Sequence, residues 1–98
     1  MIVDGYSKLE VFWKRHSRAR TPLLRWFDTV TKVNWRSLQE IRQTFRHADA
    51  VYDCTVFNIH GNDYRLISKI DFEAQAVDVR FVLTHPEYDR GSWKNDCR

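Results

Sequence analysis

The sequence predicts an α+β domain, in which a short N-terminal strand and two to three helices pack on one face of an antiparallel sheet that ends in a three-stranded meander. Two observations predict this class. Apolar residues recur every three or four positions through the first half of the chain, as in amphipathic helices, and every second position from about Val51, as in half-buried strands. The length of 98 residues and the hydrophobic content of 43% suit one domain with its own core.

The first strand and the first helix are expected within the opening twenty residues. Residues 1–3 are apolar and precede an Asp-Gly pair, which predicts a short edge strand. Ser7 and Glu10 match a capping box, in which each side chain bonds a free backbone N–H of the first helical turn. We therefore expect a helix from Ser7 to about Arg18.

Two further helices are expected before the strands begin. Thr21 matches an N-cap and Pro22 the first helical position, which together predict a helix to about Val33. Ser37 and Glu40 match a second capping box and predict a short third helix. Apolar residues at three- and four-residue spacing give both helices a buried side.

Three strands with short connections are expected in the second half, which makes them an antiparallel meander. Their predicted ranges are Val51–Ile59, Tyr64–Phe72 and Ala76–Leu83, with a Gly-Asn turn between the first two. Strict alternation divides the last strand into two faces. One face carries Val77, Val79, Phe81 and Leu83, and the other carries Asp78, Arg80, Val82 and Thr84.

The same alternation predicts a basic face on the sheet. If the helices cover the apolar side, Arg65, Lys69 and Arg80 project from the uncovered side of neighbouring strands. The hairpin turn is expected to bring Arg65 beside Arg80. A β-bulge in either strand would shift this register.

The last residues are expected to lie outside the fold. The proline after His85 ends the last strand, so that residues 1–90 form the domain and residues 91–98 form a polar, frayed tail. Cys54 and Cys97 are expected to be plain thiols in a reducing compartment, and neither has a second Cys or His at zinc-ligand spacing. We therefore expect no metal and no other cofactor.

Charge and hydropathy narrow the choice of partners. The first 50 residues carry ten Lys and Arg against five Asp and Glu, whereas the remaining residues carry six against eight. A basic half and a pI near 9.1 favour a polyanion such as RNA, although a solvated basic helix face gives the same count. No apolar run approaches the ~18 residues that a membrane span needs, and no signal-like leader is present, so we expect a cytoplasmic protein.

Cleavage of RNA without a metal needs a base for the ribose 2′-OH, cations for the phosphorane and an acid for the leaving oxygen. Arginine pairs two phosphate oxygens with its planar fork, and histidine titrates near neutral pH. The basic face supplies Arg65 and Arg80, with His85 and Tyr88 just past the last strand. Each is also an ordinary surface residue, so that anion binding without chemistry stays open.

Longer motifs add to this inventory of residue types. They are Phe57-Asn58-Ile59, Gly61-Asn62, Tyr64-Arg65-Leu66, Val79-Arg80-Phe81-Val82 and Thr84-His85-x-Glu87-Tyr88-Asp89. The combined pattern resembles the HigB-type toxins of bacterial type II toxin–antitoxin systems, within the wider RelE/ParE-like group. The resemblance includes Phe12-Trp13-x-x-His16 and extends to about Arg90. It implies a RelE-like fold.

The resemblance also implies a function. HigB-type toxins are mRNA interferases, which are endoribonucleases that often cut messenger RNA on the ribosome and are held inactive by a HigA-like helix-turn-helix antitoxin. The implied reaction is metal-independent and proceeds by attack of the 2′-OH. In this sequence the resemblance assigns Arg65 and Arg80 to the scissile phosphate, His85 to general acid or base catalysis, and Tyr88 to proton transfer or stacking.

Three further residues are expected to contact RNA. Asn58 and Asn62 match the family motif, and Lys69 lies on the basic face. Asn62 also suits a tight turn that requires a positive φ. His60 occupies a position that varies in the family, so it receives no role.

Three other functions remain open. A ParE-like relative would inhibit DNA gyrase through protein contacts and would need no acid or base. A non-catalytic module would bind RNA with a strong dependence on salt. A co-repressor would act with its antitoxin on its own promoter.

Overall fold

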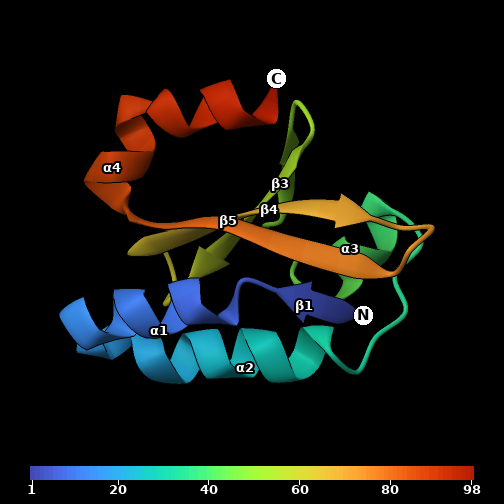
Figure 1. The fold of residues 1–98 in the computed structure, drawn as a ribbon, viewed down its shortest axis with the longest axis horizontal. Coiled ribbons are helices and arrows are strands. Elements are labelled where there is room, and N and C mark those ends of the chain that lie inside the picture. The colour runs from blue at the N-terminus through green and yellow to red at the C-terminus, as the bar shows by residue number, and fades with distance from the viewer.

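The computed structural model describes all 98 residues of the chain and has the predicted α+β class (Figure 1). The strands are β1 (Ile2–Asp4), β2 (Asp49–Val51), β3 (Cys54–Ile59), β4 (Tyr64–Asp71) and β5 (Ala76–Thr84). The α-helices are α1 (Tyr6–Arg15), α2 (Arg20–Val30), α3 (Leu38–Thr44) and α4 (His85–Arg90). Two 3₁₀ helices are η1 (Ser17–Ala19) and η2 (Ser92–Cys97).

The five strands form one mixed sheet in the order β1-β5-β4-β3-β2. β3, β4 and β5 make the predicted antiparallel meander, and β1 is the predicted edge strand, paired parallel to β5. The single strand predicted from Val51 to Ile59 is instead two strands. A turn with Tyr52 at φ 52° separates β2 from β3 and lets them pair with each other.

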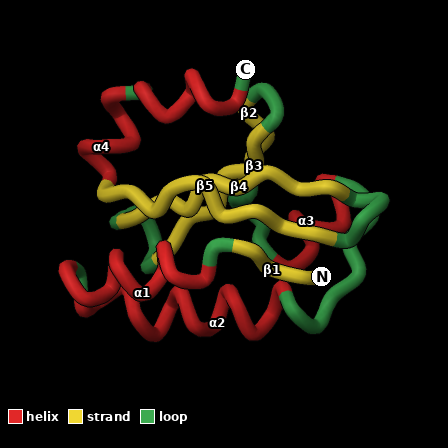
Figure 2. Tube along the Cα trace, in the orientation of Figure 1, coloured by secondary structure: helices red, strands yellow, loops and turns green.

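One face of the sheet is covered by α1 and α2, as predicted (Figures 1 and 2). These helices bury Leu9, Leu23 and Trp26, each at most 1% exposed, in one cluster with Phe57 and Leu66 of the sheet. Each such side chain contributes about 1.5–3 kcal/mol when it leaves water. None of the helices combines the length and the apolar character that a membrane-spanning segment requires.

The opposite face, predicted to be uncovered, carries a second layer made of α4 and η2 (Figure 2). Trp93 of η2 is only 3% exposed and packs in a cluster with Val56 of β3 and Ile67 of β4. The expectation of a frayed tail after residue 90 is therefore wrong. The segment folds because Trp93 and Cys97 are both buried in one apolar cluster with residues of the sheet.

A disulfide bond joins Cys97 of η2 to Cys54 of β3, so the expectation of two free thiols is also wrong. The two cysteines are 43 residues apart in the sequence, and only the return of η2 over the sheet brings them together. The backbone N–H of Asp53 donates a 2.8 Å hydrogen bond to the carbonyl of Cys97 beside this link. The C-terminal layer is thus tied to the sheet covalently.

The predicted helix starts are confirmed in part. Ser37 caps α3 by accepting a 3.3 Å hydrogen bond from the N–H three residues later. By contrast, α1 follows Gly5 without a side-chain cap, and α2 continues from η1 without a cap from Thr21. The complete capping box is at α4, where Thr84 and Glu87 each bond the backbone N–H of the other.

A β-bulge at Arg80 interrupts the pairing of β4 with β5. Ile67 pairs with Phe81, but the next residue, Ser68, pairs with Val79. Arg80 is therefore an extra residue on β5 without a partner on β4.

The bulge reverses the two faces of β5 beyond this point. Val79 and Val82 belong to the core under α1 and α2, whereas Phe81 and Leu83 pack in the C-terminal layer. The prediction that Phe81 and Leu83 share a face with Val79 is therefore wrong. Arg80 keeps its predicted orientation, away from α1 and α2, since it bonds η2.

Substitution of Gly5 by alanine is expected to lower the free energy of unfolding by about 1–2 kcal/mol. Gly5 has φ 94°, and an added Cβ would lie 3.0 Å from the carbonyl oxygen of Val79. Gly61, at φ 62° with nothing within 4 Å of such a Cβ, is the matched control. Urea unfolding of both variants would measure the difference, and equal losses would contradict the close approach at Gly5.

Candidate functional site

Arg65 lies at the hairpin end of β4 and is 8% exposed. Its guanidinium donates hydrogen bonds to the carbonyls of Asn62 and Tyr64, at 3.1 and 3.0 Å, and to the side-chain oxygen of Asn62. These partners are neutral, so they orient the group without compensating its charge. The ring of Tyr88 lies against it, with the guanidinium carbon 5.1 Å from the ring centroid.

Helix α4 carries Tyr88, which contacts Arg65 of β4, and His85, which contacts Tyr88. The Nδ1 of His85 is 2.8 Å from the carboxylate of Asp89, which orients the imidazole and leaves Nε2 for proton transfer. Tyr88 contacts His85 edge-on at a centroid distance of 6.4 Å and stacks on Trp93 at 5.1 Å. We name Arg65, His85, Tyr88 and Asp89 the hairpin cluster.

The two asparagines predicted to bind RNA have different surroundings. Asn62 holds Arg65, and the positive φ values of the turn belong to His60 and Gly61 rather than to Asn62. The conformational role expected for Asn62 is therefore wrong, and its contact with Arg65 replaces it. Asn58 is half-buried and pairs with Arg65 across β3 and β4, at the border of the hairpin cluster.

Arg80 is held at the bulge by two carboxylates. Its Nε and Nη2 donate to the two oxygens of Asp96 at 2.7 and 2.9 Å, and its Nη1 donates to Asp78 at 2.9 Å. The two-pronged bond with Asp96, followed by the bond with Asp78, raises the pKa of Arg80 above its ordinary value. The same contact with Arg80 holds the pKa of Asp96 below its ordinary value. Arg80 is therefore compensated in charge, unlike Arg65.

Two lysines complete the surroundings of Asp96. After Arg80, the positive charges of Lys69 and Lys8 also lower the pKa of Asp96. Lys8 donates a 3.0 Å hydrogen bond from Nζ to the carbonyl of Val79, next to the bulge. We name Arg80, Lys8, Lys69 and Asp96 the bulge cluster.

The structure separates the two arginines that were predicted to lie side by side. Arg65 pairs across the sheet with Leu83, three residues along β5 from Arg80. Because a strand rises ~3.3 Å per residue, the two positions lie about 10 Å apart along the sheet. Arg65 therefore lies with His85, Tyr88 and the two asparagines, and Arg80 lies with Lys69.

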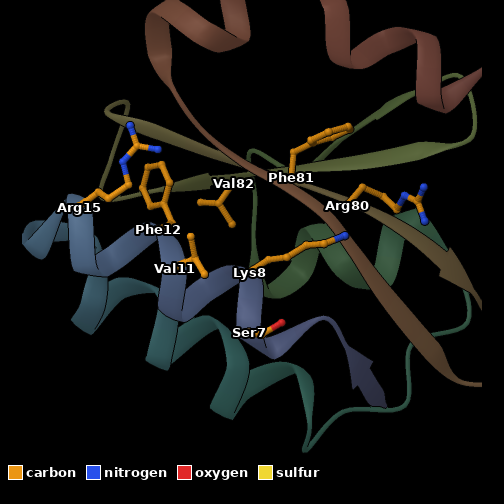
Figure 3. Close-up of a pocket in the computed structure, with 8 residues that line it drawn as sticks. All are labelled: Ser7, Lys8, Val11, Phe12, Arg15, Arg80, Phe81 and Val82. Carbon is orange, nitrogen blue, oxygen red and sulfur yellow. The ribbon is translucent and has the colours of Figure 1, made fainter.

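A groove of about 270 Å³ follows the outer edge of β5 beside α1 (Figure 3). β1 pairs with β5 only over residues 76–78, so this edge is open further along the strand. No acidic residue lines the groove, and its lining comprises Ser7, Lys8, Val11, Phe12, Arg15, Arg80, Phe81 and Val82. Cations combined with aromatic side chains suit a single-stranded nucleic acid, whose phosphates and bases need both.

Comparison with known proteins identifies the family. The family model HigB_toxin, described as the RelE-like toxic component of a toxin–antitoxin system, matches residues 19–91. This range is most of the chain and includes the hairpin, the bulge and α4. The chain belongs to the HigB family. Its membership in a toxin–antitoxin family implies an antitoxin partner.

Curated relatives of this HigB-family chain carry matching names. The mRNA interferase toxin HigB of Escherichia coli (strain K12) is 28% identical over 82 residues, which is 78% of this chain and 76% of the relative. Proteins named mRNA interferase HigB from Escherichia coli O157:H7 and Shigella flexneri match to the same extent. The predicted resemblance is thereby confirmed.

In this HigB-family chain, His16 lies close to the hairpin cluster, although no role was predicted for it from the sequence. Its ring stacks on Phe12 at 4.5 Å and lies 5.7 Å from the ring of Tyr64, next to the hairpin cluster. Its charge is one of the lesser causes that lower the pKa of Glu87 on α4. The Phe-Trp-x-x-His motif was the available signal, because its spacing places His16 at the end of α1 on the side of Phe12.

Asp96 was missed for a different reason. It lies in the segment expected to be frayed, so no contact was assigned to it. The Trp-x-x-x-Cys spacing around it was the signal, since it predicts one helical turn with an apolar side and would place Asp96 beside that side.

Glu87→Gln keeps an oxygen that can accept the same hydrogen bonds but removes a negative charge from the N-terminus of α4, so it is expected to lower stability near neutral pH by about 0.3–1 kcal/mol and to have little effect near pH ~3. Hydrogen bonds from the backbone N–H and then the hydroxyl of Thr84 hold the pKa of Glu87 below its ordinary 4.5. Its stabilisation is therefore present above that pH and is lost as the pH falls through the lowered value. Thermal unfolding across this range measures the effect, and exposed Glu73→Gln is the control.

Proposed function

We propose that this chain is an mRNA interferase, an endoribonuclease that acts in the cytoplasm on messenger RNA as the toxin of a type II toxin–antitoxin system. Its family and the names of its relatives support this function. One observation in the structure carries the proposal: a nearly buried arginine without a compensating acid lies against Tyr88, whose ring in turn contacts the histidine of a histidine–aspartate pair. This combination can stabilise a negatively charged transition state and transfer a proton next to it.

The proposed reaction proceeds by attack of the ribose 2′-OH on the adjacent phosphorus. A base removes the 2′ proton, the P–O5′ bond breaks, and an acid gives a proton to the leaving 5′ oxygen. The products are a 2′,3′-cyclic phosphate and a 5′-hydroxyl end. We assign one of the two proton transfers to His85, oriented by Asp89, and assign hydrogen bonding or stacking at the nucleotide to Tyr88.

Cations take the part that a metal would take in other nucleases. We assign Arg65 and Arg80 to successive phosphates of the RNA, because their separation along the sheet suits different phosphates better than one. Lys69 supports Arg80, and Asn58 and Asn62 lie where the strand would pass Arg65. Cleavage should therefore persist in an excess of EDTA.

The groove beside β5 extends this surface toward α1. Lys8 and Arg15 supply charge, and Phe81 supplies an aromatic face along it. A strand entering here would cross Arg80 before it reaches His85. We propose that the ribosome presents messenger RNA to this surface and that a HigA-like helix-turn-helix antitoxin is the natural inhibitor.

Primer extension on defined transcripts after induced expression tests the function. Discrete new 5′ ends that also form with purified protein in EDTA would support it. DNA breaks with intact transcripts would instead indicate a ParE-like action on gyrase, and salt-dependent RNA binding without product would indicate a non-catalytic module.

A further inference from the structure

Asp96 is the anion of the bulge cluster, where it binds Arg80 directly and lies within reach of the positive charges of two lysines. Both of its oxygens accept hydrogen bonds from Arg80, in the two-pronged geometry that arginine uses for phosphate as well as for carboxylate. Lys8 and Lys69 lie close enough for their charges to act on the same carboxylate. The carboxylate of Asp96 therefore fills a site that is chemically suited to a phosphate.

The next residue along the chain, Cys97, fixes Asp96 in this position. Its disulfide bond to Cys54 anchors the end of η2 to β3. The remaining contacts of η2 are non-covalent: Trp93 stacks on Tyr88, and its indole N–H donates a 2.9 Å bond to the carbonyl of Tyr88. Through these contacts η2 touches both clusters, since Tyr88 in turn lies against Arg65.

We propose that η2 is a redox-controlled internal inhibitor, in which Asp96 takes the place of an RNA phosphate on Arg80 while the Cys54–Cys97 disulfide is closed. The inference rests on the proposed function, because it concerns the regulation of the same site. Opening the disulfide releases η2 and frees Arg80, Lys8 and Lys69 for the RNA backbone. Asp78 remains on Arg80 and keeps it oriented.

The disulfide is expected to be redox-sensitive because messenger RNA, the proposed substrate, lies in the cytoplasm. Thiol systems keep most cysteines of the cytoplasm reduced, and the disulfides that occur there are usually transient or redox-sensing. Opening requires a dithiol reductant, which supplies two electrons and two protons and becomes a disulfide itself. Cys54 and Cys97 then each carry a thiol, and the backbone is otherwise unchanged.

The test measures the affinity of purified protein for a fluorescent 2′-O-methyl RNA oligonucleotide, which cannot be cleaved by 2′-OH attack. Fluorescence anisotropy is recorded for oxidised protein and for protein in dithiothreitol, with the thiol state checked by mass spectrometry after alkylation. Reduction is expected to tighten Kd by about tenfold, which corresponds to one charge-assisted bond exchanged. Cys97→Ser should bind tightly in both conditions.

Asp96→Asn keeps the disulfide and removes the competing charge, so the oxidised variant should bind RNA about as tightly as the reduced wild type. Asp28→Asn, an exposed carboxylate on α2 with the same change in net charge, is the matched control and should leave affinity as in the wild type. Equal Kd values for oxidised and reduced wild type, or for oxidised Asp96→Asn and oxidised wild type, would overturn the proposal that η2 is an internal inhibitor.

The two proposals fail in different ways. Redox-dependent binding of the oligonucleotide by a protein that never cuts ordinary RNA would overturn the proposed nuclease and support the internal inhibitor. Cleavage at equal rates in both redox states, with equal affinity, would support the nuclease and overturn the inhibitor.

Discussion

Replacement of Arg80 and His85 together by alanine is expected to leave mRNA cleavage and growth arrest undetectable. Loss of a general acid or base costs about 10²–10⁴ in rate, and loss of the cation that holds a neighbouring phosphate weakens RNA binding by about 1.5–3 kcal/mol. The combined loss is smaller than the product if both residues act in one step. Single-turnover cleavage of a defined transcript by the reduced protein measures it.

A matched double variant separates this effect from charge and folding. Arg25 is exposed on α2 and His47 is exposed before β2, so Arg25→Ala with His47→Ala removes the same residue types outside both clusters. Wild-type cleavage by this control is expected. Normal cleavage by Arg80→Ala with His85→Ala would show that the proposed site is wrong.

Loss of the disulfide is expected to lower the free energy of unfolding by about 2–4 kcal/mol. The bond closes a loop across 43 residues, and a link of this span removes much of the conformational entropy of the unfolded chain. It also holds Trp93 in its buried position. Urea unfolding of oxidised and reduced wild type gives the difference directly.

Cys54→Ser with Cys97→Ser supplies the internal standard for that measurement. Its stability should match the reduced wild type and should not respond to dithiothreitol. A reduced wild type as stable as the oxidised protein would mean that the packing of Trp93 alone holds η2 in place.

Much of the fold was predictable because local pattern determines it. The two-residue period in the second half predicted the bounds of β4 to within one residue. It also predicted that Arg65 and Lys69 lie on the face away from α1 and α2. The helical periods gave α1, α2 and α3, with boundaries in error where a helix begins without a side-chain cap. Such starts leave no sequence signal at the first residue.

The errors have a common physical origin in long-range pairing. The bulge at Arg80 depends on how β5 meets β4, and a strand's own sequence does not reveal an extra residue. The disulfide likewise depends on η2 returning to β3, which no spacing rule predicts. The start of α4 was not predicted, although the sequence contains a signal for it: Thr84 and Glu87 have the spacing of a capping box.

In the candidate site, too, local features were predicted from the sequence and features that depend on long-range pairing were not. The residue types were predictable from the sequence, and the grouping of His85 and Tyr88 beyond the last strand agrees with the position of Tyr88, which contacts both His85 and Arg65. The separation of Arg65 from Arg80 and the presence of Asp96 required the register and the C-terminal layer.

The bulge at Arg80 has a consequence for mutational scanning of β5. Tolerance of polar residues should follow one odd–even rhythm up to Val79 and the opposite rhythm from Phe81 onward. Deleting Arg80 would restore a single rhythm and leave Phe81 and Leu83 facing the C-terminal layer, with Val79 and Val82 still in the core under α1 and α2. In sequence comparisons of β5, a one-residue gap at this position is therefore compatible with the same two apolar clusters, whereas a gap elsewhere in the strand is not.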